Sequence, residues 1–262
     1  MVQKLKEIAR QMKVIDSHLH VNDDKDLFGR DLTFTWEDLN SYLGIVSRVQ
    51  LMPAFENTDD SREANHRFFK KIKSLNNKNQ IWGFYWPHPH EVDPDFLKTY
   101  DIAGIKYHPS VSQLEVHKAT AVLDLVEDTG LPLIVHCGRN IKSRIEYCIE
   151  AYKKRNITII AAHLGGVAPP LVSRALQMLE GTDDFDNFYL DTSSIDVARL
   201  IARAINVVGS ERILFGTDIP FHEYHVLKYA LQQVWERDDV RVTSQDMKNI
   251  LYANVERIHT TK

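Results

Sequence analysis

The sequence predicts an α/β fold, a single-domain (β/α)8 barrel of the TIM type in which parallel strands alternate with helices. Two observations support this architecture. Short apolar runs recur along the chain, and each is followed by a polar or Gly/Pro break and then by a helical pattern. The length of 262 residues also suits one such barrel. An open doubly wound sheet is the alternative, but no GxGxxG motif follows the first strand.

Eight apolar runs are expected to be strands. Their alternation with helical segments favours parallel pairing, because neighbouring parallel strands need a long crossover connection. The expected strands cover residues 13–18, 46–52, 81–86, 103–107, 132–136, 157–162, 187–191 and 212–216. No linker, low-complexity tract or short repeat divides the chain, so residues 1–262 are interpreted as one domain.

Several helix ends can be located from the sequence. Residues 2–12 place apolar side chains at helical spacing among charged ones, which predicts an amphipathic N-terminal helix. Thr35 and Asp38 have the spacing of a capping box at the start of a helix. A helix is also expected over residues 112–129, with Gly130 closing its end.

The composition limits the function classes. Hydrophobic residues make up 44% of the chain, which is enough for a large core. The net charge of -4 gives no basic surface for nucleic acid, and no apolar stretch reaches the ~20 residues that span a bilayer. The two cysteines cannot form a disulfide framework. We therefore expect a cytoplasmic protein with a small-molecule substrate and neither a nucleic-acid nor a membrane partner.

Side chains that can bind metals recur at the carboxyl ends of the expected strands. His18 and His20 stand two positions apart on the first strand, so both imidazoles project from the same face. Residues at the carboxyl ends of barrel strands meet on one face, where active sites are built. Later strands contribute further candidates to this face: Lys106, His108, His136, His163 and Asp218.

This recurrence predicts a metal site. A buried His or Asp costs free energy unless it is paired or bound to a metal, so packing alone is a poor explanation for His18, His20, His136 and Asp218 together. Three imidazoles and one carboxylate suit Zn²⁺ best, although Mn²⁺, Fe²⁺, Co²⁺ or Ni²⁺ could bind the same set. Asp218 could take a proton from a metal-activated water, and His163 could hydrogen-bond the water or an oxyanion.

Other residues are expected to contact the substrate. Arg139 closely follows a predicted ligand and could hold a carboxylate through its planar guanidinium, although a surface role is the alternative. Trp86 begins a proline-rich segment at the end of the third strand and is expected to form a wall of the pocket. The loops after the strands are short, which predicts a small pocket or one that a partner subunit of a homo-oligomer completes.

Five motifs in a fixed order resemble the amidohydrolase superfamily. They are DSHLH, GIKYHP, VHCG, AHLGG and FGTDIP. More narrowly, they resemble its metal-dependent TIM-barrel branch, the amidohydrolase 2 type, which includes enzymes related to aminocarboxymuconate semialdehyde decarboxylase. The resemblance spans residues 14–258 and implies His163 as an acid/base or oxyanion-stabilising residue. It implies as metal ligands His18, His20, His136 and Asp218.

The resemblance leaves the role of Lys106 open. Other branches of the superfamily use a carboxylated lysine at this position to bridge two metal ions, whereas the decarboxylase-like branch has one metal. We expect one divalent ion, with Lys106 neutralising a substrate anion or packing in the site. His108 shares its face and is expected to contact the substrate as well.

Three functions fit these residues. The first is a metal-dependent hydrolase of a small amide, cyclic amide or lactone that uses a metal-activated water. The alternative is non-oxidative, metal-dependent decarboxylation of a small carboxylic acid, which needs the same ligands. The third is a non-catalytic barrel that binds a metal without reacting. The sequence does not separate the first two, because both depend on the same side chains.

Overall fold

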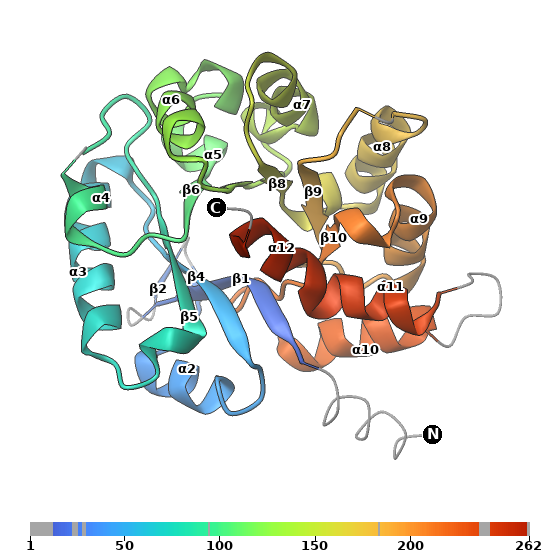
Figure 1. Cartoon of the computed structure of the whole chain (residues 1–262), viewed down its shortest axis with the longest axis horizontal. Helices are drawn as coiled ribbons and strands as arrows, with labels where there is room; N and C mark the ends of the chain where they lie inside the picture. The colour runs from blue at the N-terminus through green and yellow to red at the C-terminus, as the bar shows by residue number, and fades with distance from the viewer. Residues whose placement is uncertain are drawn as a thin grey trace.

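Eight parallel strands form a ring at the centre of the molecule, and helices surround them (Figure 1). The computed structural model describes residues 13–22, 26–27, 30–93, 95–182, 184–235 and 242–260. The helix expected over residues 2–12 lies outside these ranges. The prediction of a (β/α)8 barrel is confirmed.

All eight expected strands are present, and they pair in chain order. Adjacent strands run parallel, as the alternation with helices predicts. The barrel strands are β1 (Ile15–Val21), β4 (Arg48–Pro53), β5 (Ile81–Tyr85), β6 (Gly104–Tyr107), β7 (Leu133–Val135), β8 (Ile159–Ala161), β9 (Phe188–Asp191) and β10 (Ile213–Leu214). A separate antiparallel pair consists of β2 (Asp26–Leu27) and β3 (Arg30–Asp31).

The segment after the last strand returns to the first strand and closes the barrel. The backbone N–H of Ser17 donates to the carbonyl of Phe215 at 2.8 Å, and the N–H of Asp218 donates to the carbonyl of His18 at 2.7 Å. An isolated parallel bridge joins the same two segments further along. Closure therefore places the histidines of β1 beside residues from the opposite end of the chain.

Helices cover the outside of the barrel (Figure 1). They are α2 (Trp36–Tyr42), α3 (Ser61–Ser74), α4 (Phe96–Thr99), α5 (Pro109–Ser112), α6 (Thr120–Thr129), α7 (Ile145–Lys154), α8 (Pro169–Leu179), α9 (Ala198–Val208), α10 (Tyr224–Trp235), α11 (Ser244–Lys248) and α12 (Asn254–Thr260). Among the described residues, none of the helices combines the length and apolarity needed to cross a membrane.

Two of the expected helix ends are confirmed and one is wrong. Thr35 caps α2 through a capping box with Asp38, and Gly130 closes α6 in the left-handed conformation. The helix expected over residues 112–129 is interrupted, because Gln113 adopts a positive φ of 51° and ends the short α5. The next α-helix begins only at Thr120.

The interior of the barrel is apolar at its amino end. Ile15, the first residue of β1, belongs to a buried cluster that includes Val255 and Ile258 of α12. Trp82 stacks on His259 of the same helix, with ring centroids 4.1 Å apart. Figure 1 shows α12 lying across the opening of the barrel that faces the viewer. Because α12 covers this end, the carboxyl end of the strands is left for a site.

Candidate active site

A cavity of about 1030 Å³ lies at the carboxyl ends of the strands. Most of the residues predicted to form the site line it: His20, Trp86, Lys106, His108, His136, Arg139 and Asp218. His18 and His163 are fully buried and are not among its lining residues. The cavity is not small, since it lies at the upper end of the common range for ligand pockets, about 300–1,000 Å³. Completion of the pocket by a partner subunit stays a prediction. The rim segments leave an open space despite their short length.

Three of the predicted metal ligands converge beside this cavity. One ligand atom each from His18, His20 and Asp218 lies within 4.8 Å of the other two. Oδ1 of Asp218 is 3.5 Å from Nε2 of His18 and 3.7 Å from Nε2 of His20. Asp218 has a positive φ of 68°, an uncommon conformation that requires support from its surroundings. Its backbone bond to β1 supplies part of that support.

The hydrogen bonds of His18 and His20 suit metal binding. Nδ1 of His20 lies 3.1 Å from the carbonyl of Pro53, which can only accept. Nδ1 of His18 donates to Oδ2 of Asp191 at 2.9 Å. In a neutral imidazole the other nitrogen then carries the lone pair, so both residues present Nε2 toward Asp218.

His136 is oriented in the same way by a different partner. Nδ1 of His163 lies 3.1 Å from the carbonyl of Ser193, so its Nδ1 carries the proton and its Nε2 accepts. Nδ1 of His136 donates to that Nε2 at 3.0 Å, which leaves Nε2 of His136 with a lone pair. His136 also stacks on His108, with ring centroids 3.9 Å apart. It is outside the compact group of three, and its role as a fourth ligand stays a prediction.

His163 occupies a buried and conformationally restricted position. Its own φ is 60°, and the next two residues, Leu164 and Gly165, have φ values of 51° and 82°. A Cβ on Gly165 would lie 2.7 Å from Cβ of Ala175, and the positive φ also disfavours other residues, so glycine is required there. Both ring nitrogens of His163 are hydrogen-bonded. Its direct role in catalysis stays a prediction.

Lys106 is also buried beside the metal-binding group. Its Nζ lies 2.9 Å from Nε2 of His18 and lines the cavity. Burial lowers the pKa of Lys106 to about 8, against the opposing effect of Asp218 and Asp191. A cation at this position can neutralise a bound anion, as the sequence suggests.

Burial controls the protonation of the other groups. It keeps the pKa of His18, His20 and His136 well below the usual value, with a further contribution from the Lys106 ammonium in each case. At neutral pH these imidazoles are therefore uncharged and able to bind a cation. Burial also raises the pKa of Asp218 to about 7, so its carboxyl group can take up and release a proton near neutrality.

The predicted substrate-binding residues form one side of the cavity. Trp86 packs between Phe55 and His108, with ring centroids at 4.1 and 5.7 Å. The buried indole Nε1 of Trp86 has no hydrogen-bond partner among the described residues. Arg139 is exposed at the rim, and no ion pair within the described part of the chain includes it. Both residues thus lie where the sequence predicts, although a ligand contact remains untested.

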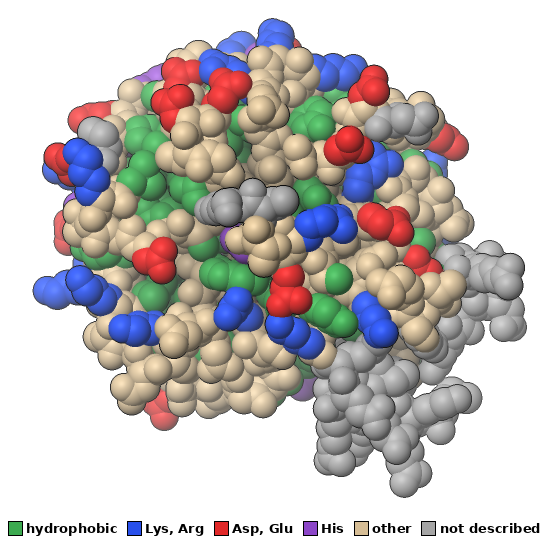
Figure 2. Space-filling view, in the orientation of Figure 1, with side chains coloured by type: hydrophobic (Ala, Val, Ile, Leu, Met, Phe, Trp, Pro, Cys, Tyr) green, Lys and Arg blue, Asp and Glu red, His purple; other side chains and the backbone are tan. Residues whose placement is uncertain are grey.

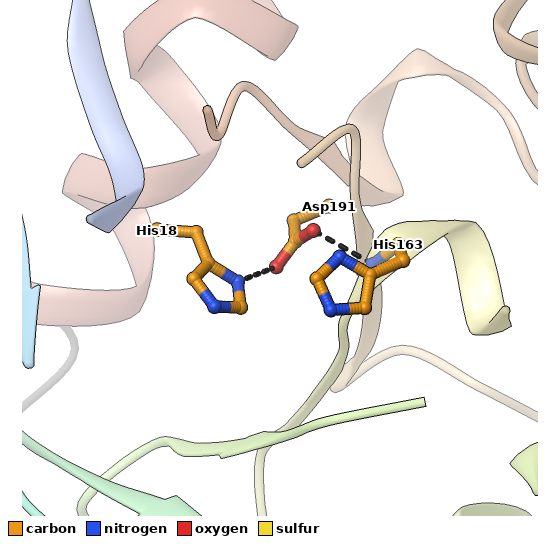
Figure 3. A group of neighbouring side chains, drawn as sticks. All are labelled: His18, His163 and Asp191. Atoms are coloured by element: carbon orange, nitrogen blue, oxygen red, sulfur yellow. Dashed lines mark hydrogen bonds and ion pairs between the residues drawn. The ribbon is translucent and has the colours of Figure 1, made fainter. Parts of the chain in front are cut away.

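Asp191 is a site residue that is absent from the predictions above. It is the last residue of β9 and is fully buried. Figure 3 shows its carboxylate between His18 and His163. The rule that selects His136 and Asp218, a polar residue at the carboxyl end of an apolar strand, also selects Asp191. Its neighbour Ser193, which hydrogen-bonds to Asp191 and His163, has no such signal.

Solved structures of other proteins share this fold. A protein from Pseudomonas putida with the provisional name 2-pyrone-4,6-dicarboxylic acid hydrolase is 15% identical, with a TM-score of 0.66 over 95% of this chain and 98% of that chain. 5-Carboxyvanillate decarboxylase from Sphingomonas paucimobilis is 16% identical, with a TM-score of 0.68 over 95% and 99%. A dihydroxybenzoic acid decarboxylase from Polaromonas, with bound manganese, is 14% identical, with a TM-score of 0.70 over 95% and 97%.

The sequence itself also matches a known family. A search of curated proteins found no match. The pattern of the family described as Amidohydrolase, however, matches residues 93–258. This range contains four of the five motifs that carry the resemblance, and the resemblance is thereby confirmed. Because the match covers more than half of its length, the chain belongs to the amidohydrolase family of enzymes.

Proposed function

We propose that this protein is a metal-dependent hydrolase that opens a small lactone, cyclic amide or amide. The observation that carries the proposal is the convergence of His18, His20 and Asp218 beside a large open cavity. A purely structural metal normally has a closed coordination sphere, whereas this group borders solvent-accessible space. The provisional name of the similar Pseudomonas putida protein also belongs to a hydrolase.

We propose Zn²⁺ as the cation, held by His18, His20 and Asp218 with His136 as a fourth ligand. The donor set fits, because hydrogen bonds at Nδ1 place the lone pair of each histidine on Nε2. The lone pair of His18 accepts from the Lys106 ammonium, which a bound cation would displace. Three imidazoles with one carboxylate are typical of zinc sites, and Mn²⁺ suits them less well. When bound, such a cation lowers the pKa of a coordinated water to about 7 and polarises a substrate carbonyl.

Asp218 is the residue that moves the proton in this proposal. A water molecule in the cavity forms a bond to the substrate carbonyl carbon as its proton passes to the Asp218 carboxylate. The same proton then goes to the leaving oxygen or nitrogen as its bond to the carbonyl carbon breaks. Ser194 donates to Oδ2 of Asp218 at 2.5 Å, which orients the carboxylate for this exchange.

The surrounding residues bind and orient the substrate. The Lys106 ammonium stabilises negative charge that develops on the carbonyl oxygen, and Arg139 binds a carboxylate at the rim. Trp86 and His108 form the wall against which a planar group packs. His163 is proposed as an acid/base residue that takes up and releases a proton at Nε2, the atom that accepts from Nδ1 of His136.

Non-oxidative decarboxylation is the second candidate. Two of the similar structures are named as decarboxylases, and one of them contains manganese. The positions of Lys106 and Arg139 on the cavity wall also suit a carboxylic acid substrate. In this reaction a C–C bond breaks to release carbon dioxide, and a proton replaces the carboxylate on the substrate carbon.

One experiment separates the two reactions. The purified protein is analysed for metal by elemental analysis and then assayed with lactones, amides and aromatic carboxylates in ¹⁸O-labelled water. Hydrolysis predicts ¹⁸O in the product carboxylate and no carbon dioxide. Decarboxylation predicts one carbon dioxide per turnover and no ¹⁸O in the organic product. A metal-loaded protein that converts none of these substrates would contradict both candidates.

A further inference from the structure

We propose that Asp191 is a positioning residue that sets the tautomer of His18 and holds His163 in the same framework. Its Oδ2 accepts from Nδ1 of His18 at 2.9 Å, and its Oδ1 accepts from the backbone N–H of His163 at 2.9 Å (Figure 3). One buried carboxylate therefore joins a predicted ligand to the predicted acid/base residue. The inference rests on the proposed function, because it takes His18 as a metal ligand.

The His18 ring lies between an acceptor and a donor. The Asp191 carboxylate accepts on the Nδ1 side, and the Lys106 ammonium donates to Nε2 at 2.9 Å. Both contacts favour the tautomer with hydrogen on Nδ1 and the lone pair on Nε2. This Nε2 atom is the one that lies 3.5 Å from Oδ1 of Asp218. Asp191 thus secures the lone pair that a cation needs.

The second oxygen of Asp191, Oδ1, also accepts hydrogen bonds. It accepts from the backbone N–H of His163 at 2.9 Å, from the N–H of Ser193 at 3.0 Å, and from the hydroxyl of Ser193. Among the described residues, each hydrogen-bond partner of the carboxylate is a donor. An asparagine amide has one accepting and one donating end, so either of its orientations would set a donor against a donor.

His18, His163 and Asp191 also have ligand atoms within 4.8 Å of one another, so a second metal site is an alternative. All three residues are buried, and none is among the residues that line the cavity. Both Asp191 oxygens already accept hydrogen bonds, Oδ2 from Nδ1 of His18 and Oδ1 from two backbone N–H groups. The geometry therefore favours a positioning role.

Asp16 offers a matched control within the chain. It is also a fully buried carboxylate next to His18. It accepts from the backbone N–H of His18 at 3.1 Å, from the N–H of Thr217 at 3.0 Å and from the hydroxyl of Tyr42 at 2.8 Å. None of these bonds involves the imidazole. Asp16→Asn therefore shows how much Zn²⁺ affinity is lost when a buried carboxylate near His18 is altered without loss of a bond to the imidazole.

The first measurement is Zn²⁺ affinity of the full chain, freed of metal by a chelator and titrated by calorimetry. Asp191→Asn is expected to weaken binding by about 10- to 100-fold, the usual effect of removing a carboxylate behind a ligand histidine. Asp16→Asn is expected to weaken it by less than about 10-fold. Unchanged affinity in Asp191→Asn, or an equal loss in both variants, would overturn the proposal.

The second measurement is the tautomer of His18 in metal-free protein, read from the ¹⁵N chemical shifts of its imidazole and assigned by loss of the signals in His18→Gln. Wild type is expected to carry hydrogen on Nδ1, and Asp191→Asn to shift it toward Nε2. Hydrogen on Nε2 in wild type would overturn the inference, even if the variant did not fold. A wild type that binds no Zn²⁺ would contradict the proposed function, while the tautomer would still decide the role of Asp191.

Discussion

Nδ1 of His136 lies 3.0 Å from Nε2 of His163, and the two rings meet edge to face. This bond joins the predicted fourth ligand to the predicted acid/base residue. His163→Asn removes the acceptor but leaves the group of His18, His20 and Asp218 intact. We expect activity to fall on the order of 10²-fold or more while metal content stays near that of wild type. Steady-state kinetics and elemental analysis measure the two quantities.

His117→Asn is a suitable control for this substitution. His117 lies on the outside of the barrel, stacked on Tyr147 with ring centroids 4.9 Å apart, and does not line the cavity. It is expected to leave activity and metal content unchanged. Loss of metal in His163→Asn would contradict this expectation and would mean that His163 either binds the metal or is needed to orient His136.

Removal of His18 tests the metal-binding group directly. His18→Ala deletes one of the three converging ligands, so metal content after purification is expected to fall. In wild type, Zn²⁺ at 100 times its dissociation constant should raise the free energy of unfolding by about 2.7 kcal/mol, because it binds only the folded state. Urea unfolding with Zn²⁺ or with chelator measures this difference. In His18→Ala, Zn²⁺ should raise the free energy of unfolding by less than it does in wild type. If the variant retained as much metal as wild type, His18 would not be a ligand.

The stability of the metal-free protein should fall in acid. Burial keeps the pKa of His18, His20, His108 and His136 well below the usual value and lowers that of His163 to about 4. Histidine in an unfolded chain has a pKa of about 6.5. Below that pH the unfolded state binds more protons than the folded state, so the stability that these groups contribute is present above pH 6.5 and lost as pH falls toward 4.

Two carboxyl groups act in the opposite direction. Burial raises the pKa of Asp218 to about 7 and that of Asp16 to about 6, so their contribution is present at low pH and lost as pH rises through these values. The histidines outnumber them and should dominate. Urea unfolding in chelator at several pH values between 5 and 7 tests the direction. His108→Gln should make the dependence shallower by about 1.4 kcal/mol per pH unit, and parallel curves would contradict this assignment.

Arg139 is expected to contribute to substrate binding rather than to the chemical step. Arg139→Ala should raise KM for a carboxylate substrate by about 10-fold, the lower end for a hydrogen bond to a charged group, and leave kcat nearly unchanged. A neutral lactone should show no such effect. Lys142→Ala removes the same charge from a nearby residue that does not line the cavity. Equal effects of the two variants would indicate a general electrostatic contribution instead.

Much of the fold could be predicted because its signals are local. The apolar runs mark all eight barrel strands, and the capping box at Thr35 and the glycine at 130 mark helix ends. These features depend on residues that are neighbours in the sequence. The break at Gln113 could not be predicted in the same way, because a positive φ at a non-glycine residue reflects its packing in the folded chain.

In the candidate site, too, local sequence patterns predict some features and only the tertiary structure decides the others. The sequence alone determined that histidines and an aspartate end several strands of one barrel, since strand period and order establish this without distances. Barrel closure determined that His18, His20 and Asp218 converge, that His136 instead contacts His163, and that Asp191 lies behind His18. These contacts join segments far apart in the chain. Their geometry therefore depends on how β1 meets the segment after β10, which no local pattern encodes.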